Sequence, residues 1–171
     1  MYVRSIHAHS DGGAVVLYEK DAFGNSTLHA AYIDASSSKV WDISLTMDAS
    51  NQEFLDSVVM GDGIYIVFSD SRSGDLDIYG QLISFSGSRL SDSNGDVLCV
   101  LSTDQSSASI DILDSLDAFL VCWEDGRNGA SDNKDIFCRQ GAIDDSGALV
   151  YYDEVALSLA LGNQQNPYVK S

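Results

Sequence analysis

Short apolar runs alternate along this chain with polar clusters of glycine, aspartate, asparagine and serine. Three runs are almost wholly apolar and end near an aromatic residue: 14–19, 64–69 and 118–124. Such runs are typical of buried β-strands, and the clusters between them are typical of tight turns. The pattern predicts strands over residues 2–9, 14–19, 27–34, 40–46, 54–60, 64–69, 76–85, 97–101, 109–113, 118–124, 135–143 and 149–155.

One local sequence occurs three times, over residues 17–24, 67–74 and 122–129. Its aromatic residue falls at positions 18, 68 and 123, which are 50 and 55 residues apart. Repeats of this length indicate units that stack on their neighbours, because one unit cannot bury its own apolar face. We therefore expect units over residues 1–52, 53–105 and 106–165, followed by a last segment over 166–171.

Each unit holds four predicted strands, which is the pattern of a β-propeller blade. Parallel solenoids have shorter coils, and an immunoglobulin-type sandwich needs about 100 residues per unit. A single proline, Pro167, agrees with sheets that keep their hydrogen-bond donors. The predicted fold class is therefore all-β, a β-propeller-like array of four-stranded antiparallel blades in which three repeats are present.

The second and third repeats share a longer motif that begins near the aromatic residue. It comprises Asp70, Arg72, Gly74, Asp77, Ile78, Tyr79 and Gln81 in the second repeat, and Trp123, Glu124, Asp125, Arg127, Gly129, Asp135, Ile136 and Phe137 in the third. This Trp-Glu-Asp-x-Arg-x-Gly … Asp-Ile-Tyr pattern resembles the propeller-type repeats of large secreted and surface proteins of bacteria. The first repeat departs from it, with Lys20 and Ala22 in the places of the aspartate and arginine. The resemblance implies a scaffold and assigns no catalytic residue.

The two ends of the chain are similar, because residues 2–5 (Tyr-Val-Arg-Ser) match residues 168–171 (Tyr-Val-Lys-Ser). A glutamine also recurs before a first strand, at Gln52, Gln105 and Gln165. We therefore expect a fourth unit to begin at 166–171. We expect residues 168–171 to pair as a strand with another copy or a following unit, and not with the third unit. Closed propellers usually have 4–8 blades, so further blades or other copies are the expected partners.

The charge of the chain restricts its partners. It carries 26 acidic and 9 basic residues, for a net charge of −17. Such a field repels nucleic acid, which we exclude as a partner. No apolar stretch reaches the ~18 residues of a membrane-spanning helix, so we expect no membrane insertion. The first residues show no apolar signal-peptide core.

Three cysteines, Cys99, Cys122 and Cys138, allow at most one internal disulfide. Unpaired cysteines are among the most buried residue types. We therefore expect all three to be small buried hydrophobic side chains, and the sequence leaves their redox state open.

Two groups of residues are candidate metal ligands. His7, His9 and Asp11 resemble the His-x-His-x-Asp motif of metallo-β-lactamase-like hydrolases. However, Gly12 stands where that motif continues with histidine, and His29 is the only other histidine, so we expect a half-exposed strand here.

The second group consists of aspartates in two equivalent loops: Asp70, Asp75, Asp77, Asp125, Asp132 and Asp135. Their oxygens would suit Ca²⁺, but their spacing matches no twelve-residue EF-hand loop. We interpret the first aspartate of each loop as a turn cap, braced by Arg72 or Arg127.

The catalytic alternative is a glycan-processing propeller enzyme. Residues 91–98 resemble the Ser-x-Asp-x-Gly-x-x-Trp box of sialidases, but lack its central aspartate and its tryptophan. The repeated placement of Arg72 and Arg127 favours a structural role. No Ser-His-Asp arrangement is recognisable. Four tyrosines could stack on sugars, although we expect them to pack between units: Tyr32, Tyr65, Tyr151 and Tyr152.

The sequence therefore predicts a non-catalytic β-propeller scaffold, extracellular or at the cell surface, that serves adhesion, assembly or recognition. We expect no enzyme activity, no catalytic residue, no cofactor and no metal site. The expected partners are other copies or further blades, with glycans as candidate ligands. Two alternatives stay open: a subunit of a homo-oligomer or filament joined by strand exchange, and a fragment of a glycan-processing propeller enzyme.

Overall fold

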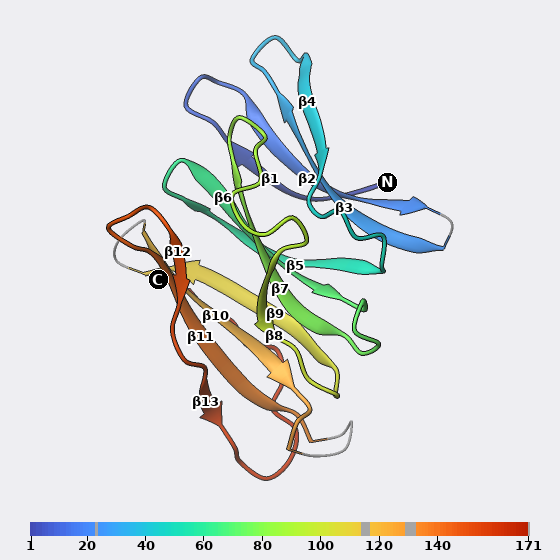
Figure 1. The fold of residues 1–171 in the computed structure, drawn as a ribbon, viewed down its shortest axis with the longest axis vertical. Coiled ribbons are helices and arrows are strands. Elements are labelled where there is room, and N and C mark those ends of the chain that lie inside the picture. The colour runs from blue at the N-terminus through green and yellow to red at the C-terminus, as the bar shows by residue number, and fades with distance from the viewer. Residues whose placement is uncertain (23, 114–116, 129–132, 171) are drawn as a thin grey trace.

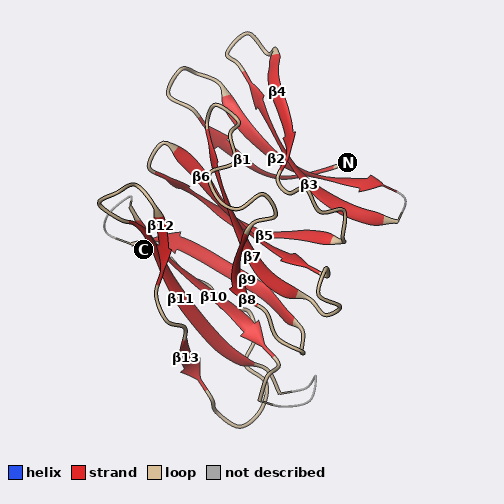
Figure 2. Cartoon of the chain, in the orientation of Figure 1, coloured by secondary structure: helices blue, strands red, loops and turns tan. Residues whose placement is uncertain are grey.

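A computed structural model describes residues 1–22, 24–113, 117–128 and 133–170. Within these ranges every regular element is a β-strand (Figure 2). They contain no helix that is long and apolar enough to cross a membrane. The strands are β1 (Tyr2–Ala8), β2 (Ala14–Ala22), β3 (Asn25–Ile33), β4 (Lys39–Ser44), β5 (Gln52–Met60), β6 (Gly63–Asp70), β7 (Asp77–Ser84), β8 (Asp96–Cys99), β9 (Gln105–Ile112), β10 (Ala118–Asp125), β11 (Asp135–Ile143), β12 (Leu149–Tyr151) and β13 (Val155–Ser158).

Consecutive strands form three antiparallel sheets. Their orders are β1-β2-β3-β4, β5-β6-β7-β8 and β9-β10-β11-β12, and β13 also pairs with β11. Each sheet is open, and its first four strands lie side by side in chain order. The all-β class and the antiparallel sheets predicted from the sequence are confirmed.

The sheets are stacked in chain order, with the second between the first and the third (Figure 1). Side chains alternate between the two faces of a strand, so a strand that is covered on both faces is apolar throughout. In β6 every residue is buried. Ile64, Ile66 and Phe68 lie in the core shared with the first sheet, whereas Tyr65 and Val67 lie in the core shared with the third.

The repeated aromatic residues occupy equivalent places on β2, β6 and β10. Tyr18, Phe68 and Trp123 are 5%, 0% and 0% exposed. The predicted equivalence and burial of these side chains are confirmed. Each also lies opposite a ring of the following strand, which for Phe68 is Tyr79 at a centroid distance of 5.9 Å.

The outer strand of the third sheet differs from the prediction. We expected one strand over 149–155, but the structure divides it into β12 and β13, which pair with different parts of β11. Between them Tyr152 donates its backbone N–H to the Gln140 carbonyl at 3.0 Å. The alternating run after Val155 therefore forms a short strand, and this sheet has five strands.

The structure assigns the pairing of the cysteines, which the sequence left open. Cys122 and Cys138 form a disulfide between β10 and β11, where they are direct partners with a Cα–Cα distance of 4.0 Å. Cys99 is free and buried, as expected. Burial raises the pKa of the Cys99 thiol to about 12, so it is protonated at neutral pH.

Candidate functional site

The loop after β6 is held by an aspartate and an arginine two residues apart. Asp70 is fully buried and accepts the backbone N–H of Arg72 at 2.8 Å. Its second oxygen pairs with the Arg72 guanidinium at 2.5 Å. The guanidinium also lies 4.1 Å from the centre of the Tyr79 ring, a cation–π contact. This arginine therefore braces its own loop, as we predicted.

The loop after β10 repeats this arrangement and adds a partner. Arg127 pairs with the fully buried Asp125 at 2.6 Å and lies 3.9 Å from the centre of the Phe137 ring. Glu154 also pairs with Arg127, through both of its carboxylate oxygens. Burial raises the pKa of Asp125, but hydrogen bonds from Arg127 and Trp123 outweigh this effect and leave its pKa below the usual value. The carboxylate therefore stays charged at neutral pH.

Replacing Arg127 with alanine is expected to lower the free energy of unfolding by about 2 kcal/mol, because Asp125 would lose a charged hydrogen-bond partner while buried. Arg72→Ala is the matched variant, and it should cost less because Glu154 has no counterpart in that loop. Urea unfolding monitored by fluorescence measures both changes. A loss of ligand binding with unchanged stability would place Arg127 in a binding site instead.

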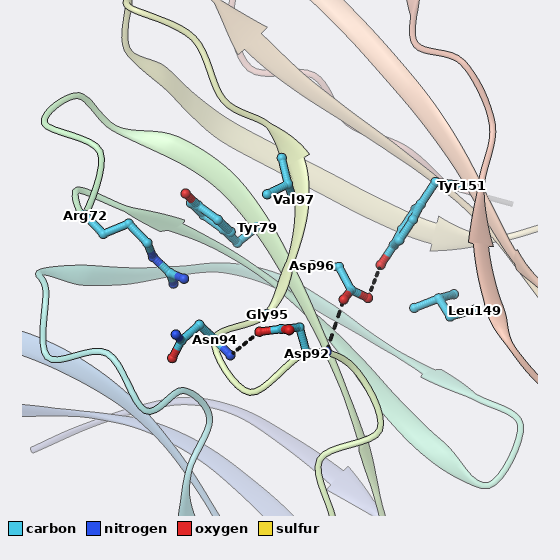
Figure 3. Close-up of a pocket in the computed structure, with 9 residues that line it drawn as sticks. All are labelled: Arg72, Tyr79, Asp92, Asn94, Gly95, Asp96, Val97, Leu149 and Tyr151. Atoms are coloured by element: carbon cyan, nitrogen blue, oxygen red, sulfur yellow. Dashed lines mark hydrogen bonds between the residues drawn. The ribbon is translucent and has the colours of Figure 1, made fainter.

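A cavity of about 640 Å³ opens between the outer strands of the second and third sheets (Figure 3). The segment that leads into β8 forms one wall. Arg72 and Tyr79 close one side, and Leu149 and Tyr151 of β12 close the other. The cavity thus includes most of the segment that resembles the sialidase box. Arg127 lines a separate cavity of about 280 Å³, so the two repeated arginines do not converge on one ligand.

Most polar groups of the larger cavity already bond to one another. Asp96 accepts the Tyr151 hydroxyl at 2.8 Å and the Asp92 backbone N–H at 3.1 Å. Asn94 accepts the Met47 backbone N–H at 3.1 Å, which ties this loop to the first unit. The Arg72 guanidinium lies over the face of the Tyr79 ring. These contacts fix the wall of the cavity. Asp92 is exposed at its rim, and its Oδ1 caps the turn by accepting the Asn94 backbone N–H at 3.0 Å.

Three of the four tyrosines that could stack on sugars pack in the core, as predicted. Tyr65 stacks on Phe119 at 4.3 Å, and its hydroxyl bonds that of Tyr151 at 2.9 Å, so both lie between the second and third sheets. Burial raises the pKa of both phenols, which are neutral as a result. Tyr32 packs against the core between the first and second sheets. For Tyr152 the interpretation is wrong, because this side chain is 54% exposed.

His7 and His9, at the end of β1 and just after it, both contact polar side chains. His7 bonds the Ser57 hydroxyl at 2.8 Å, and burial lowers its pKa. His9 pairs with Asp11 at 2.8 Å. In the part of the chain that the structure describes, no three His, Cys, Asp or Glu residues are arranged to hold a metal ion.

The aspartates of the two loops also have structural partners. Asp77 accepts the Leu101 backbone N–H at 2.9 Å and the Ser73 hydroxyl. Asp135 accepts the Asn128 side-chain amide at 3.0 Å. Asp75 is exposed, and Asp132 lies outside the described residues. Ser73 and Asn128 are donors within these loops, which agrees with the turn-cap interpretation, whereas Leu101 ties Asp77 to the segment after β8.

Acidic or hydroxyl side chains join each sheet to the first strand of the next. Glu19 accepts the Phe54 N–H at 2.9 Å, and Asp56 accepts the Ile110 N–H at 3.0 Å. Each contact lies shortly after a buried glutamine: Phe54 is two residues after Gln52, and Ile110 is five residues after Gln105. These contacts fix the position of one sheet on another.

The last described residues make the same two contacts on the outer face of the third sheet. Glu124, the counterpart of Glu19, accepts the Asn166 N–H at 2.8 Å, and Ser109, the counterpart of Asp56, accepts the Val169 N–H at 3.2 Å. Asn166 and Val169 follow Gln164 by two and five residues. The repeated glutamine is therefore Gln164, and our assignment of Gln165 was wrong.

The expected behaviour of residues 168–171 is corrected by the same contacts. Residues 168–170 are not in a strand, and Val169 packs against Cys122, Ile136 and Cys138 of the chain's own third sheet. Ser171 lies outside the described residues. The sequence match with residues 2–5 aligns Val169 with Val3, but the contacts give a different alignment. Val169 takes the place equivalent to Ile110, and Ile110 is equivalent to Ile6.

No protein-family model matches this chain, and no curated protein matches it.

The sequence reasoning missed several residues that the structure assigns to these contacts. Glu19 and Glu124 stand at the same place in the repeat, so their shared role could have been inferred from the alignment of the repeats. Glu154 has no repeated counterpart and gave no such signal. Asp56 and Ser109 are equivalent in register but differ in type, and only the pairing of β5 and β9 with their neighbours identifies them.

Proposed function

We propose that the protein is a non-catalytic scaffold of β-propeller type, extracellular or at the cell surface, that serves adhesion, assembly or recognition. The observation that carries this proposal is the stack of three equivalent sheets, in which the middle sheet is buried on both faces. Blades of a propeller bury their apolar faces on neighbouring blades in this way. A side-chain-to-backbone contact also joins each pair of neighbouring sheets, through Glu19 between the first and second sheets and through Asp56 between the second and third.

The disulfide supports an extracellular location. Disulfides persist in oxidising compartments and are rare where thiols are kept reduced. The acidic composition, with a net charge of −17, suits a solvated surface that repels polyanions. The propeller-type repeats of bacterial secreted and surface proteins, which the second and third repeats resemble, support the same proposal.

The cavity beside β8 favours one alternative, a fragment of a glycan-processing propeller enzyme. It is large enough for a sugar, and it includes the segment that resembles the sialidase box. Against catalysis, Asp96 is bound to Tyr151 and to a backbone amide, and Arg72 is bound to Asp70. Strand exchange through residues 168–171 has lost its basis, because the described part of this segment lies on the chain's own third sheet.

Binding and turnover on one panel of glycans test the proposal. We expect saturable binding to surface glycans without release of product, weakened by Asp92→Asn, which removes the charge but keeps an oxygen to accept the Asn94 N–H. Asp62→Asn, at an exposed turn between β5 and β6, is the matched control and should bind as the unchanged chain does. Hydrolysis that disappears in Asp96→Asn would establish the enzyme instead, and the absence of binding to every glycan would remove glycan recognition from the proposal.

A further inference from the structure

The face of the first sheet that points away from the second sheet is apolar at its centre. In β1, Val3 and Ile6 lie directly opposite Tyr18 and Val16 of β2, so their side chains share this face. Val3 and Ile6 are 55% and 64% exposed. A groove of about 220 Å³ lies on this face, and its lining includes Val3, Val16, Tyr18, Lys39 and Asp42.

The same face is covered in both other sheets. By register, Ala14, Val16 and Tyr18 correspond to residues that are all 0% exposed: Ile64, Ile66, Phe68, Phe119, Val121 and Trp123. The first sheet covers Ile64, Ile66 and Phe68 of the second sheet. The second sheet covers Phe119, Val121 and Trp123 of the third. In the first sheet, no described part of this chain lies over the equivalent positions. This surface is therefore one half of an interface that the chain forms twice within itself.

The other half is found at the opposite end of the stack. Leu120, Cys122 and Glu124 on β10 correspond to Val15, Leu17 and Glu19 on β2, which cover the second sheet. In the third sheet the segment 166–170 lies over part of these positions, where it contacts Glu124 and the patch around the disulfide. No other sheet of the described chain covers them. By its two backbone contacts, this segment occupies the place that the first strand of a following sheet would take.

Charged side chains of the two end faces pair within their own face. On the first sheet Lys39 pairs with Asp42 at 2.7 Å, and on the third sheet Glu124 pairs with Lys134 at 3.1 Å. Lys20 is exposed on the first sheet and stands where the equivalent residues of the other repeats are Asp70 and Asp125. The apolar surface of the two faces, and not their charge, therefore favours their association.

We propose that the outer face of the first sheet binds the outer face of the third sheet of a second copy, head to tail, and that residues 166–170 compete with this contact in the same chain. The proposal rests on the proposed function, because it extends the stacking of sheets from one chain to the next. A head-to-tail contact of this kind produces rings or filaments. While segment 166–170 is in place, the third face is partly occupied and association is weak.

Sedimentation velocity of the full chain over a wide range of concentration tests this. Val169→Asp places a charge in the patch formed by Cys122, Ile136 and Cys138, and should release the segment. Asn166→Pro is a second way to release it, because Asn166 has a φ of 55° that proline cannot adopt, and its N–H is bonded to Glu124. Both variants are expected to form larger species at lower concentration than the unchanged chain.

The same experiment identifies the surface involved. Adding Ile6→Asp, on the exposed face of the first sheet, should return either variant to single chains. Leu90→Asp is the matched control, since Leu90 is also exposed, at 57%, but lies outside the end faces. If both released variants stay single chains, or if they associate equally with Ile6→Asp, the proposal is wrong. Neither result would affect glycan binding, which tests the proposed function separately.

Discussion

Replacing Trp123 with alanine is expected to lower the free energy of unfolding by about 3–5 kcal/mol, the usual cost of removing a large buried aromatic side chain. Trp123 is 0% exposed and lies in the core between the second and third sheets. Its indole N–H also donates to Asp125 at 3.2 Å, so the change removes a partner of a buried carboxylate. Equilibrium unfolding in urea, followed by circular dichroism, measures the loss.

Two variants separate the contributions to this effect. Trp123→Phe keeps a ring in the core and removes only the indole hydrogen bond and some volume, so it should cost less than the alanine variant. Tyr18→Ala removes the equivalent aromatic of the first sheet, on a face that no described part of the chain covers with another sheet. It should therefore also cost less. Equal losses for Tyr18→Ala and Trp123→Ala would contradict the view that stacking of sheets stabilises these positions.

Reducing the disulfide is expected to lower the free energy of unfolding by about 3 kcal/mol, the value for a closed loop of roughly 15 residues. Cys122 and Cys138 are 16 residues apart in sequence and bridge β10 to β11. The bridge reduces the number of conformations that the unfolded chain can adopt between Cys122 and Cys138. Thermal unfolding with and without reductant measures the effect, and Cys122→Ala with Cys138→Ala should reproduce it.

Cys99 provides the control for this measurement. In Cys99→Ala, which removes the buried free thiol, reductant should still lower stability by the same amount. In the double alanine variant reductant should have no effect. A chain whose stability is insensitive to reductant before any substitution would contradict the importance of the bridge.

The strands and their repetition could be predicted because they depend on local patterns. The apolar runs ending at Tyr18, Phe68 and Trp123 mark the second strand of each sheet, and glycine-containing turns mark the ends of strands. The disulfide was missed because it depends on the register of β10 and β11, which places Cys122 opposite Cys138. The break between β12 and β13 was missed because residues 149–155 contain no glycine or proline to mark the end of a strand.

The candidate site was predictable to a similar extent. The spacing of Asp125 and Arg127 was enough to predict that they pair across their own turn. The stacking of Arg127 on Phe137 and its bond to Glu154 depend on β11 and on the segment after β12, which are distant in sequence. The position of Val169 also depends on tertiary contacts, because a short segment without its own strand partners has no pattern that fixes its register.

The burial of β6 on both faces has a consequence for the exchange of backbone amide hydrogens with solvent. Its two neighbouring strands bond its amides, and a sheet packs on each face, so local fluctuations expose these groups least. Amides of β6 should therefore exchange only when the whole stack unfolds. Those of β1, whose outer edge and outer face are open to solvent, should exchange through smaller openings. The exchange rate along the chain would then measure how far each sheet depends on its neighbours.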